Sequence, residues 1–176
     1  MSELKNILAI SGSTRKASVN LHILKHLAGL YKERARITIY EELDQLPHFN
    51  PDLDIDPPPP QVARFRELIG AADGVLICTP EYVFSMPGSL KNALEWMVST
   101  VILSDKPAAL ITASLSGLKA HEELQLVMKT IGATLSPATN LLIQSPKTKI
   151  SADGQITDPT TAGQLHELME NILGLI

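Results

Sequence analysis

The stretch Asn6–Asn20, NILAISGSTRKASVN, contains the transition that decides the fold. Asn6–Ile10 is an apolar run of strand length, and the polar segment Ser11–Asn20 that follows contains a glycine, several hydroxyls and two cations. Beyond it, apolar residues return at helical spacing, at Ile23, Leu24, Leu27 and Tyr31. The chain therefore predicts a buried strand, a short polar turn and an amphipathic helix, in that order.

The same alternation continues along the rest of the chain. Further strands are predicted at Arg36–Tyr40, Gly74–Thr79, Ala108–Thr112 and Thr139–Gln144. Helical spacing of apolar residues follows them, as at Val62, Phe65, Ile69 and Ala72; Leu90, Ala93, Leu94 and Met97; Leu124, Val127, Met128 and Ile131; and Leu165, Leu168, Met169 and Ile172. This alternation predicts an α/β fold whose parallel sheet is covered by helices on both faces. The segment Leu46–Gln61, with six prolines, predicts a long loop before the second helix.

Length and composition limit what the protein does. A chain of 176 residues and 19.1 kDa buries about 70% of its surface on folding, which predicts a single domain over residues 1–176. The net charge of −4 argues against nucleic-acid binding. The lone Cys78 excludes an intramolecular disulfide and favours the reducing cytoplasm. No apolar stretch approaches the length of a secretion signal or a membrane span, so we expect neither secretion nor membrane insertion.

The turn after the first strand has the features of a phosphate site. Free N–H groups and the positive end of the helix dipole are expected there. Hydroxyl, amide and cationic side chains surround them: Ser13, Thr14, Ser18, Asn20, Arg15 and Lys16. Neither a P-loop nor a dinucleotide fingerprint is present, which favours a terminal monophosphate. The alternative is that Ser18 serves only as a helix N-cap.

The loop after the third strand, Pro80–Asn92, predicts the other half of the site. Loops after the first and third strands leave a doubly wound sheet at the same edge. Two prolines stiffen this loop, and Tyr82 and Phe84 offer flat apolar surface, a combination that suits a planar heterocyclic ring. The alternative is that both aromatic residues only cover the core.

These two loops resemble those of the NAD(P)H-dependent FMN reductases of the flavodoxin-like fold. The first matches the pattern G-S-x-R-x-x-S-x-N at Gly12, Ser13, Arg15, Ser18 and Asn20. The second matches P-E-Y-N-x-S-x-P-G-x-L-K-N-x-x-[DE]-W at Pro80, Glu81, Tyr82, Ser85, Pro87, Gly88, Leu90, Lys91, Asn92, Glu95 and Trp96. The resemblance implies a five-stranded parallel sheet in the order 2-1-3-4-5 and non-covalently bound FMN.

The resemblance further implies an FMN-dependent oxidoreductase that takes hydride from NADPH or NADH and reduces a second small-molecule acceptor, such as a quinone, free flavin, azo compound or metal oxyanion. No catalytic side chain and no metal ligand are expected. The expected cofactor-binding residues are Ser11, Ser13, Thr14, Arg15, Ser18, Val19, Asn20, Pro80, Glu81, Tyr82, Val83, Ser114, Ser116 and Gly117. Two alternatives are a non-enzymatic FMN electron-transfer protein that acts on protein partners and a flavin-free regulatory or scaffold domain.

Two sites depart from the family pattern. Val83 stands where the family usually has asparagine, which removes one polar contact near the ring. Ala120 and His121 stand where relatives often carry glycine. His22 and His26 are interpreted as part of a solvated helix face, and Cys78 as a buried structural thiol.

An assembly is also expected. An apolar stretch, Val101–Leu103, follows the helix predicted at Leu90–Val98. A monomer could not bury the apolar surface of both in its own core. The family resemblance also implies a homodimer or homotetramer.

Overall fold

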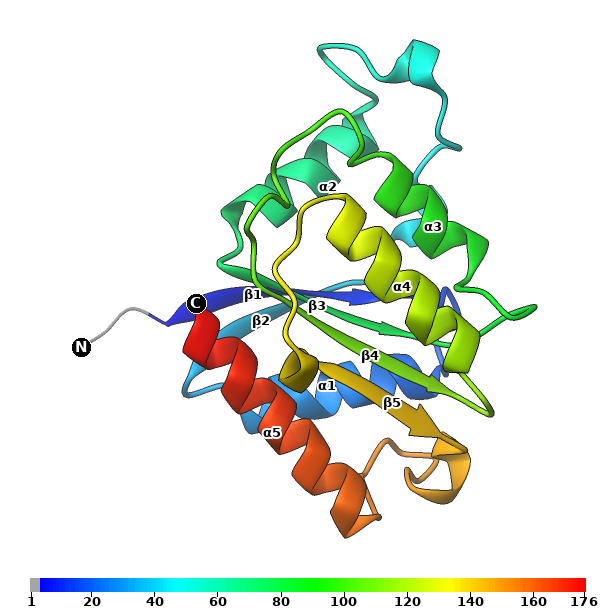
Figure 1. The fold of residues 1–176 in the computed structure, drawn as a ribbon, viewed down its shortest axis with the longest axis vertical. Coiled ribbons are helices and arrows are strands. Elements are labelled where there is room, and N and C mark those ends of the chain that lie inside the picture. The colour runs from blue at the N-terminus through cyan, green and yellow to red at the C-terminus, as the bar shows by residue number, and fades with distance from the viewer. Residues whose placement is uncertain (1–3) are drawn as a thin grey trace.

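Five parallel strands form the centre of the protein in the computed structural model, which describes residues 4–176. They are β1 (Lys5–Ser11), β2 (Ala35–Tyr40), β3 (Gly74–Thr79), β4 (Ala108–Ser114) and β5 (Asn140–Gln144). Every neighbouring pair is parallel and the spatial order is β2-β1-β3-β4-β5, which confirms the predicted sheet (Figure 1). The first three residues of the expected domain 1–176 lie outside the described range.

Five helices cover the sheet in two layers. The helices α1 (Val19–Leu30) and α5 (Pro159–Leu175) lie on one face, and α2 (Pro60–Ala71), α3 (Gly88–Glu95) and α4 (Leu118–Thr130) lie on the other (Figure 1). Because successive strand residues point to opposite faces, Ile7 and Ala9 pack against α1 and α5, whereas Leu8 and Ile10 pack into the second core. The apolar faces predicted from helical spacing therefore form two cores.

The predicted strand limits agree with the observed ones to within two residues. Thr139 belongs to a short 3-10 helix, Pro137–Thr139, so β5 begins one residue later than predicted. The helix predicted over Leu90–Val98 ends at Glu95, because the N–H groups of Met97 and Val98 turn to acceptors three residues back.

The proline-rich segment projects beside α2 and α3 (Figure 1). Prolines cannot donate a backbone hydrogen bond, and Pro60 accordingly stands at the start of α2, where none is needed. The segment is held at its base, where the Trp96 indole Nε1–H donates to the Pro47 carbonyl at 2.8 Å and the Asn92 Oδ1 accepts from the Phe49 N–H at 2.7 Å. Over residues 4–176, no helix has the length and apolar character needed to cross a membrane.

Candidate functional site

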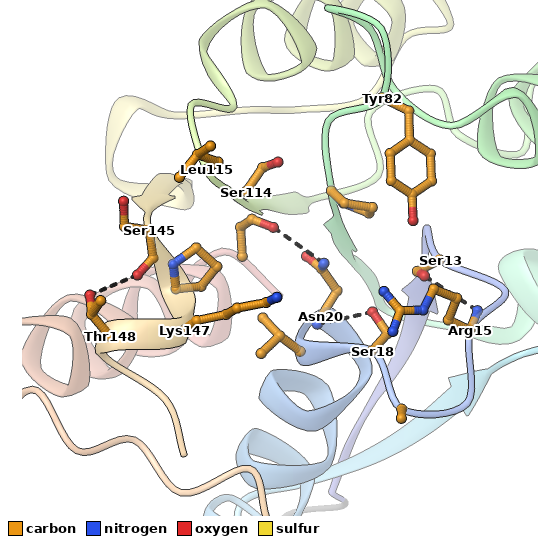
Figure 2. Close-up of a pocket in the computed structure, with 15 residues that line it drawn as sticks. Ser13, Arg15, Ser18, Asn20, Tyr82, Ser114, Leu115, Ser145, Lys147 and Thr148 are labelled. Carbon is orange, nitrogen blue, oxygen red and sulfur yellow. Dashed lines mark hydrogen bonds between the residues drawn. The ribbon is translucent and has the colours of Figure 1, made fainter. Parts of the chain in front are cut away.

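A cavity of about 470 Å³ opens at the carboxyl edge of the sheet, where the loops after β1, β3, β4 and β5 meet (Figure 2). Parallel strands end on the same side, so segments far apart in the sequence converge there. Its volume falls within the range of about 300–1,000 Å³ that is typical of small-ligand sites. Its lining residues are Ser13, Arg15, Ala17, Ser18, Val19, Asn20, Pro80, Tyr82, Ala113, Ser114, Leu115, Ser145, Pro146, Lys147 and Thr148.

The loop between β1 and α1 presents the start of a helix to this cavity. Ser18 is the N-cap of α1: its side-chain oxygen accepts from the Asn20 N–H at 3.2 Å. Ser13 also turns its hydroxyl inward, where it accepts from the Arg15 N–H at 3.3 Å. Arg15 itself is exposed, and its guanidinium points back over the N-terminus of α1 (Figure 2). Hydroxyls, helix N–H groups and a cation thus meet at one end of the cavity, as an anion site requires.

Asn20 ties this loop to the neighbouring strands. It is 3% exposed, its Nδ2 donates to the Ala113 carbonyl at 3.3 Å, and its Oδ1 accepts from the Cys78 thiol at 3.3 Å. Burial raises the pKa of Cys78 well above its usual value, so this thiol stays protonated and packs, as expected from the sequence. One Asn20 amide proton remains for a ligand.

Gly12 allows the first loop to lie directly against the end of β3. A Cβ at this position would be 2.4 Å from the Thr79 Oγ1 and 2.6 Å from its Cβ. The Gly12 N–H donates to the Cys78 carbonyl at 2.8 Å. Any side chain at residue 12 would therefore push the two loops of the cavity apart.

The loop after β3 forms another wall of the cavity, next to the loop between β1 and α1. Pro80 and Tyr82 line it, and the Tyr82 ring is half exposed (Figure 2). Tyr82 and Ser85 exchange backbone hydrogen bonds of 2.8 and 3.0 Å, which close a tight turn with Val83 and Phe84 at its tip. Both tip residues have positive φ, 52° and 56°, and their side chains are 95% and 78% exposed. This backbone conformation suits asparagine or glycine, so Val83 is strained there and its side chain points away from the cavity.

Glu81 joins this loop to the loop after β4. Its carboxylate accepts from the N–H groups of Gly117 at 3.2 Å, Lys119 at 2.9 Å and Ala120 at 3.1 Å, which form the N-terminus of α4. The carboxylate therefore caps a helix rather than lining the cavity. Gly117 has φ 80°, a left-handed conformation that strains any other residue, and a Cβ there would also meet Leu142 Cδ1 at 2.8 Å.

The expected site residues thus divide into two groups. The first group lines the cavity: Ser13, Arg15, Ser18, Val19, Asn20, Pro80, Tyr82 and Ser114. The second group lies in the same loops outside the lining: Ser11, Thr14, Glu81, Val83, Ser116 and Gly117. Ser11 is buried and its hydroxyl donates to the Ser13 carbonyl at 3.0 Å, so it supports the loop between β1 and α1 from beneath.

Sequence reasoning missed the wall made by the turn after β5. Ser145, Pro146, Lys147 and Thr148 line the cavity beside Ser114 and Leu115. The one available signal was the position of β5 at the end of the parallel sheet, because the loop that follows it leaves at the same edge.

The histidines singled out from the sequence lie elsewhere. His22 and His26 are half-buried rather than fully solvated, and His22 packs against Gly154 in the segment before α5. His121 lies on α4 with its Nδ1 2.9 Å from the Thr112 hydroxyl, and burial lowers its pKa below 6.5. Within the part of the chain that the structure describes, no group of three His, Cys, Asp or Glu side chains is placed to hold a metal ion.

Comparison with known proteins agrees with this geometry. The sequence pattern of the family described as NADPH-dependent FMN reductase matches residues 5–146. The chain belongs to this family. It is therefore an FMN-dependent oxidoreductase with NAD(P)H as co-substrate.

Individual relatives extend the likeness over nearly the whole chain. The chain is 32% identical over 174 residues to the NADH:(hydroxy)cinnamate reductase subunit CrdA of Vibrio ruber, covering 96% of this chain and 85% of that protein. It is 34% identical over 176 residues to an NADPH:quinone oxidoreductase of Arabidopsis thaliana, covering 94% and 89%. The solved structure of FerB, a flavoenzyme NAD(P)H:(acceptor) oxidoreductase from Paracoccus denitrificans, matches with a TM-score of 0.86 and 31% identity, covering 98% and 97%.

Proposed function

We propose that the cavity binds FMN with its phosphate at the N-terminus of α1 and its ring against Pro80 and Tyr82. The observation that carries this proposal is the division of the cavity lining into anion-binding groups and a flat apolar surface. Ser13, Arg15 and Ser18 supply hydroxyls and charge at the N-terminus of α1, where the helix dipole favours an anion. FMN has the same division between a phosphate and an isoalloxazine ring.

The bound FMN would supply the hydride and electron chemistry, and the protein would supply binding and orientation. Asn20 holds the phosphate loop against β3 and β4, through its bonds to Cys78 and Ala113. Glu81 fixes the ring loop to the N-terminus of α4. Ser114 and Leu115 close the third wall. In this arrangement no side chain has to act as a nucleophile.

We propose that the second acceptor is a planar, largely apolar molecule, with a quinone as the leading candidate. Tyr82 and Leu115 stand at the mouth of the cavity, 48% and 81% exposed, and offer apolar surface to such a molecule. The relative from Arabidopsis thaliana is named as a quinone oxidoreductase, which supports the same choice.

We further propose a homodimer or homotetramer in the cytoplasm, where reduced nicotinamide is available. A groove between α3 and α4 is lined by Leu94, Val98, Leu126, Val127 and Ile131, among others. Val98 and Leu126 are 65% and 66% exposed. Val101, beyond the end of α3, is 79% exposed. A second copy would cover this apolar surface, and sedimentation equilibrium would detect it. A monomeric mass at all concentrations would reject the assembly.

Turnover of the purified protein tests the functional proposal. The protein, loaded with FMN, is expected to oxidise NADPH or NADH directly and to pass the electrons to benzoquinone. A non-enzymatic electron-transfer protein would retain FMN but fail to oxidise either nicotinamide without a protein partner. A protein that does not bind FMN at all would contradict the proposal as a whole.

A further inference from the structure

The turn after β5 contributes a wall of the cavity that extends beyond the residues of the family match. The matched residues end at 146, whereas the cavity lining continues to Lys147 and Thr148. Lys147 is the charged residue in this wall, and its ammonium points into the cavity toward Asn20 (Figure 2).

The backbone beneath Lys147 is held by several hydrogen bonds. Ser145 adopts a left-handed conformation, with φ 50° and ψ 50°, and its N–H donates to the Ser114 carbonyl at 3.0 Å. The N–H and the hydroxyl of Thr148 both donate to the Ser145 carbonyl, at 3.1 and 2.9 Å. Ile150 is 3% exposed and its N–H donates to the Pro146 carbonyl at 2.9 Å. The turn thus aims its side chains from a fixed position, and the left-handed serine is the residue that redirects the chain.

The charges of the cavity are all of one sign. Arg15 and Lys147 are its charged lining residues, and no carboxylate of residues 4–176 lines it with them. Neither cation lies within 4.0 Å of an acidic group in the same described range. The net charge of the whole chain is −4, so a hollow that collects two cations without acidic partners is built for an anion.

The two cations approach the N-terminus of α1 from opposite sides. Arg15 comes from the loop after β1, Lys147 from the turn after β5, and Ser18 and Asn20 lie between them (Figure 2). A phosphate monoester carries a charge of about −1.5 to −2 at pH 7, which one arginine and one helix end balance incompletely. We propose that Lys147 is the second cation of the phosphate site and faces Arg15 across the bound phosphate of FMN.

This inference rests on the proposed position of FMN, and it excludes two other roles for Lys147. The flat apolar surface of the cavity is formed by Pro80 and Tyr82 on another loop, so Lys147 is assigned to the phosphate and not to the ring. It is equally not assigned to the 2′-phosphate of NADPH, because its side chain points toward Asn20 beside the N-terminus of α1 (Figure 2).

Flavin titrations of the apoprotein test the assignment. The variant Lys147→Gln is compared with wild type and with Lys149→Gln, which removes the same charge from the same turn at a side chain that does not line the cavity. Each protein is titrated with FMN and with riboflavin, which lacks the phosphate. We expect Lys147→Gln to raise the Kd for FMN about tenfold. This is the lower limit of the effect expected when a charge-assisted hydrogen bond is lost, because the ammonium is exposed. Riboflavin binding should not change, Lys149→Gln should match wild type, and Lys147→Arg should recover most of the FMN affinity.

Other results would overturn the inference. An equal loss of FMN and riboflavin affinity would place Lys147 on the ring, and an unchanged Kd with a raised KM for NADPH but not NADH would place it on the dinucleotide. An unchanged Kd and unchanged KM values would show that Lys147 has no role in the site. If wild type itself fails to bind FMN, the proposed position of the cofactor fails first, and the two failures are distinguished by this control.

Discussion

Removal of the Glu81 side chain most directly tests how the loop after β3 and the loop after β4 are held together. Its carboxylate is the acceptor for three N–H groups at the N-terminus of α4, between 2.9 and 3.2 Å. Loss of a single N-capping side chain costs about 0.5–2 kcal/mol. Because three donors lose their acceptor together and are only partly rehydrated, we expect Glu81→Ala to lower the free energy of unfolding by about 2 kcal/mol.

For a chain of this length, such a loss lowers the melting temperature by roughly 4–8 °C. Thermal and urea unfolding of the FMN-free protein measure it. Glu122→Ala is the matched control. Glu122 lies in α4, the helix that Glu81 caps, and its ion pair with Lys119, at 2.7 Å, is exposed to solvent. Glu122→Ala should unfold like wild type, and Glu81→Ala should also bind FMN more weakly. If both variants unfold at the same temperature, the capping role is wrong.

Three further predictions concern the tip of the ring loop, His121 and the kinetics. Val83→Asn should stabilise the protein by about 1 kcal/mol, because asparagine tolerates the positive φ that strains valine; a lower urea midpoint would refute this. Burial makes the His121 side chain bind its proton less readily in the folded than in the unfolded protein, so wild type should lose stability as the pH falls below 6.5 toward the lower folded pKa. Urea titrations at pH 7.5 and 5.5 should therefore show a weaker pH dependence of stability for His121→Gln than for wild type. Because one cavity serves donor and acceptor in turn, double-reciprocal plots of NADPH against benzoquinone should be parallel; intersecting lines would contradict a shared cavity.

The parts of the fold that local sequence determines were predicted closely. The limits of β3 agree to the residue, since its apolar run is buried on both faces and stops at Pro80. The predicted end of α3 was wrong by three residues, because the change to 3-10 hydrogen bonding after Glu95 leaves no clear mark in the apolar spacing. Thr139 was placed in a strand because threonine favours strands, yet Pro137 begins a 3-10 turn there.

The site was predictable where a motif lies within one loop and not where distant loops cooperate. Ser13, Arg15 and Ser18 form their end of the cavity from a single turn. Glu81 was expected at the ring, but its partners lie 36 to 39 residues along the chain, in a helix whose position depends on the whole sheet. Lys147 was missed for the same reason, since only the parallel order of the sheet brings the turn after β5 beside α1.

A crystal structure of the protein with FMN is the most direct test of where the cofactor lies. The account predicts one FMN per chain, with its phosphate within hydrogen-bond distance of Ser13, Ser18 and the Lys147 ammonium and with its ring against Pro80 and Tyr82. An FMN bound at another surface, or one whose ring occupies the α1 end of the cavity, would contradict it.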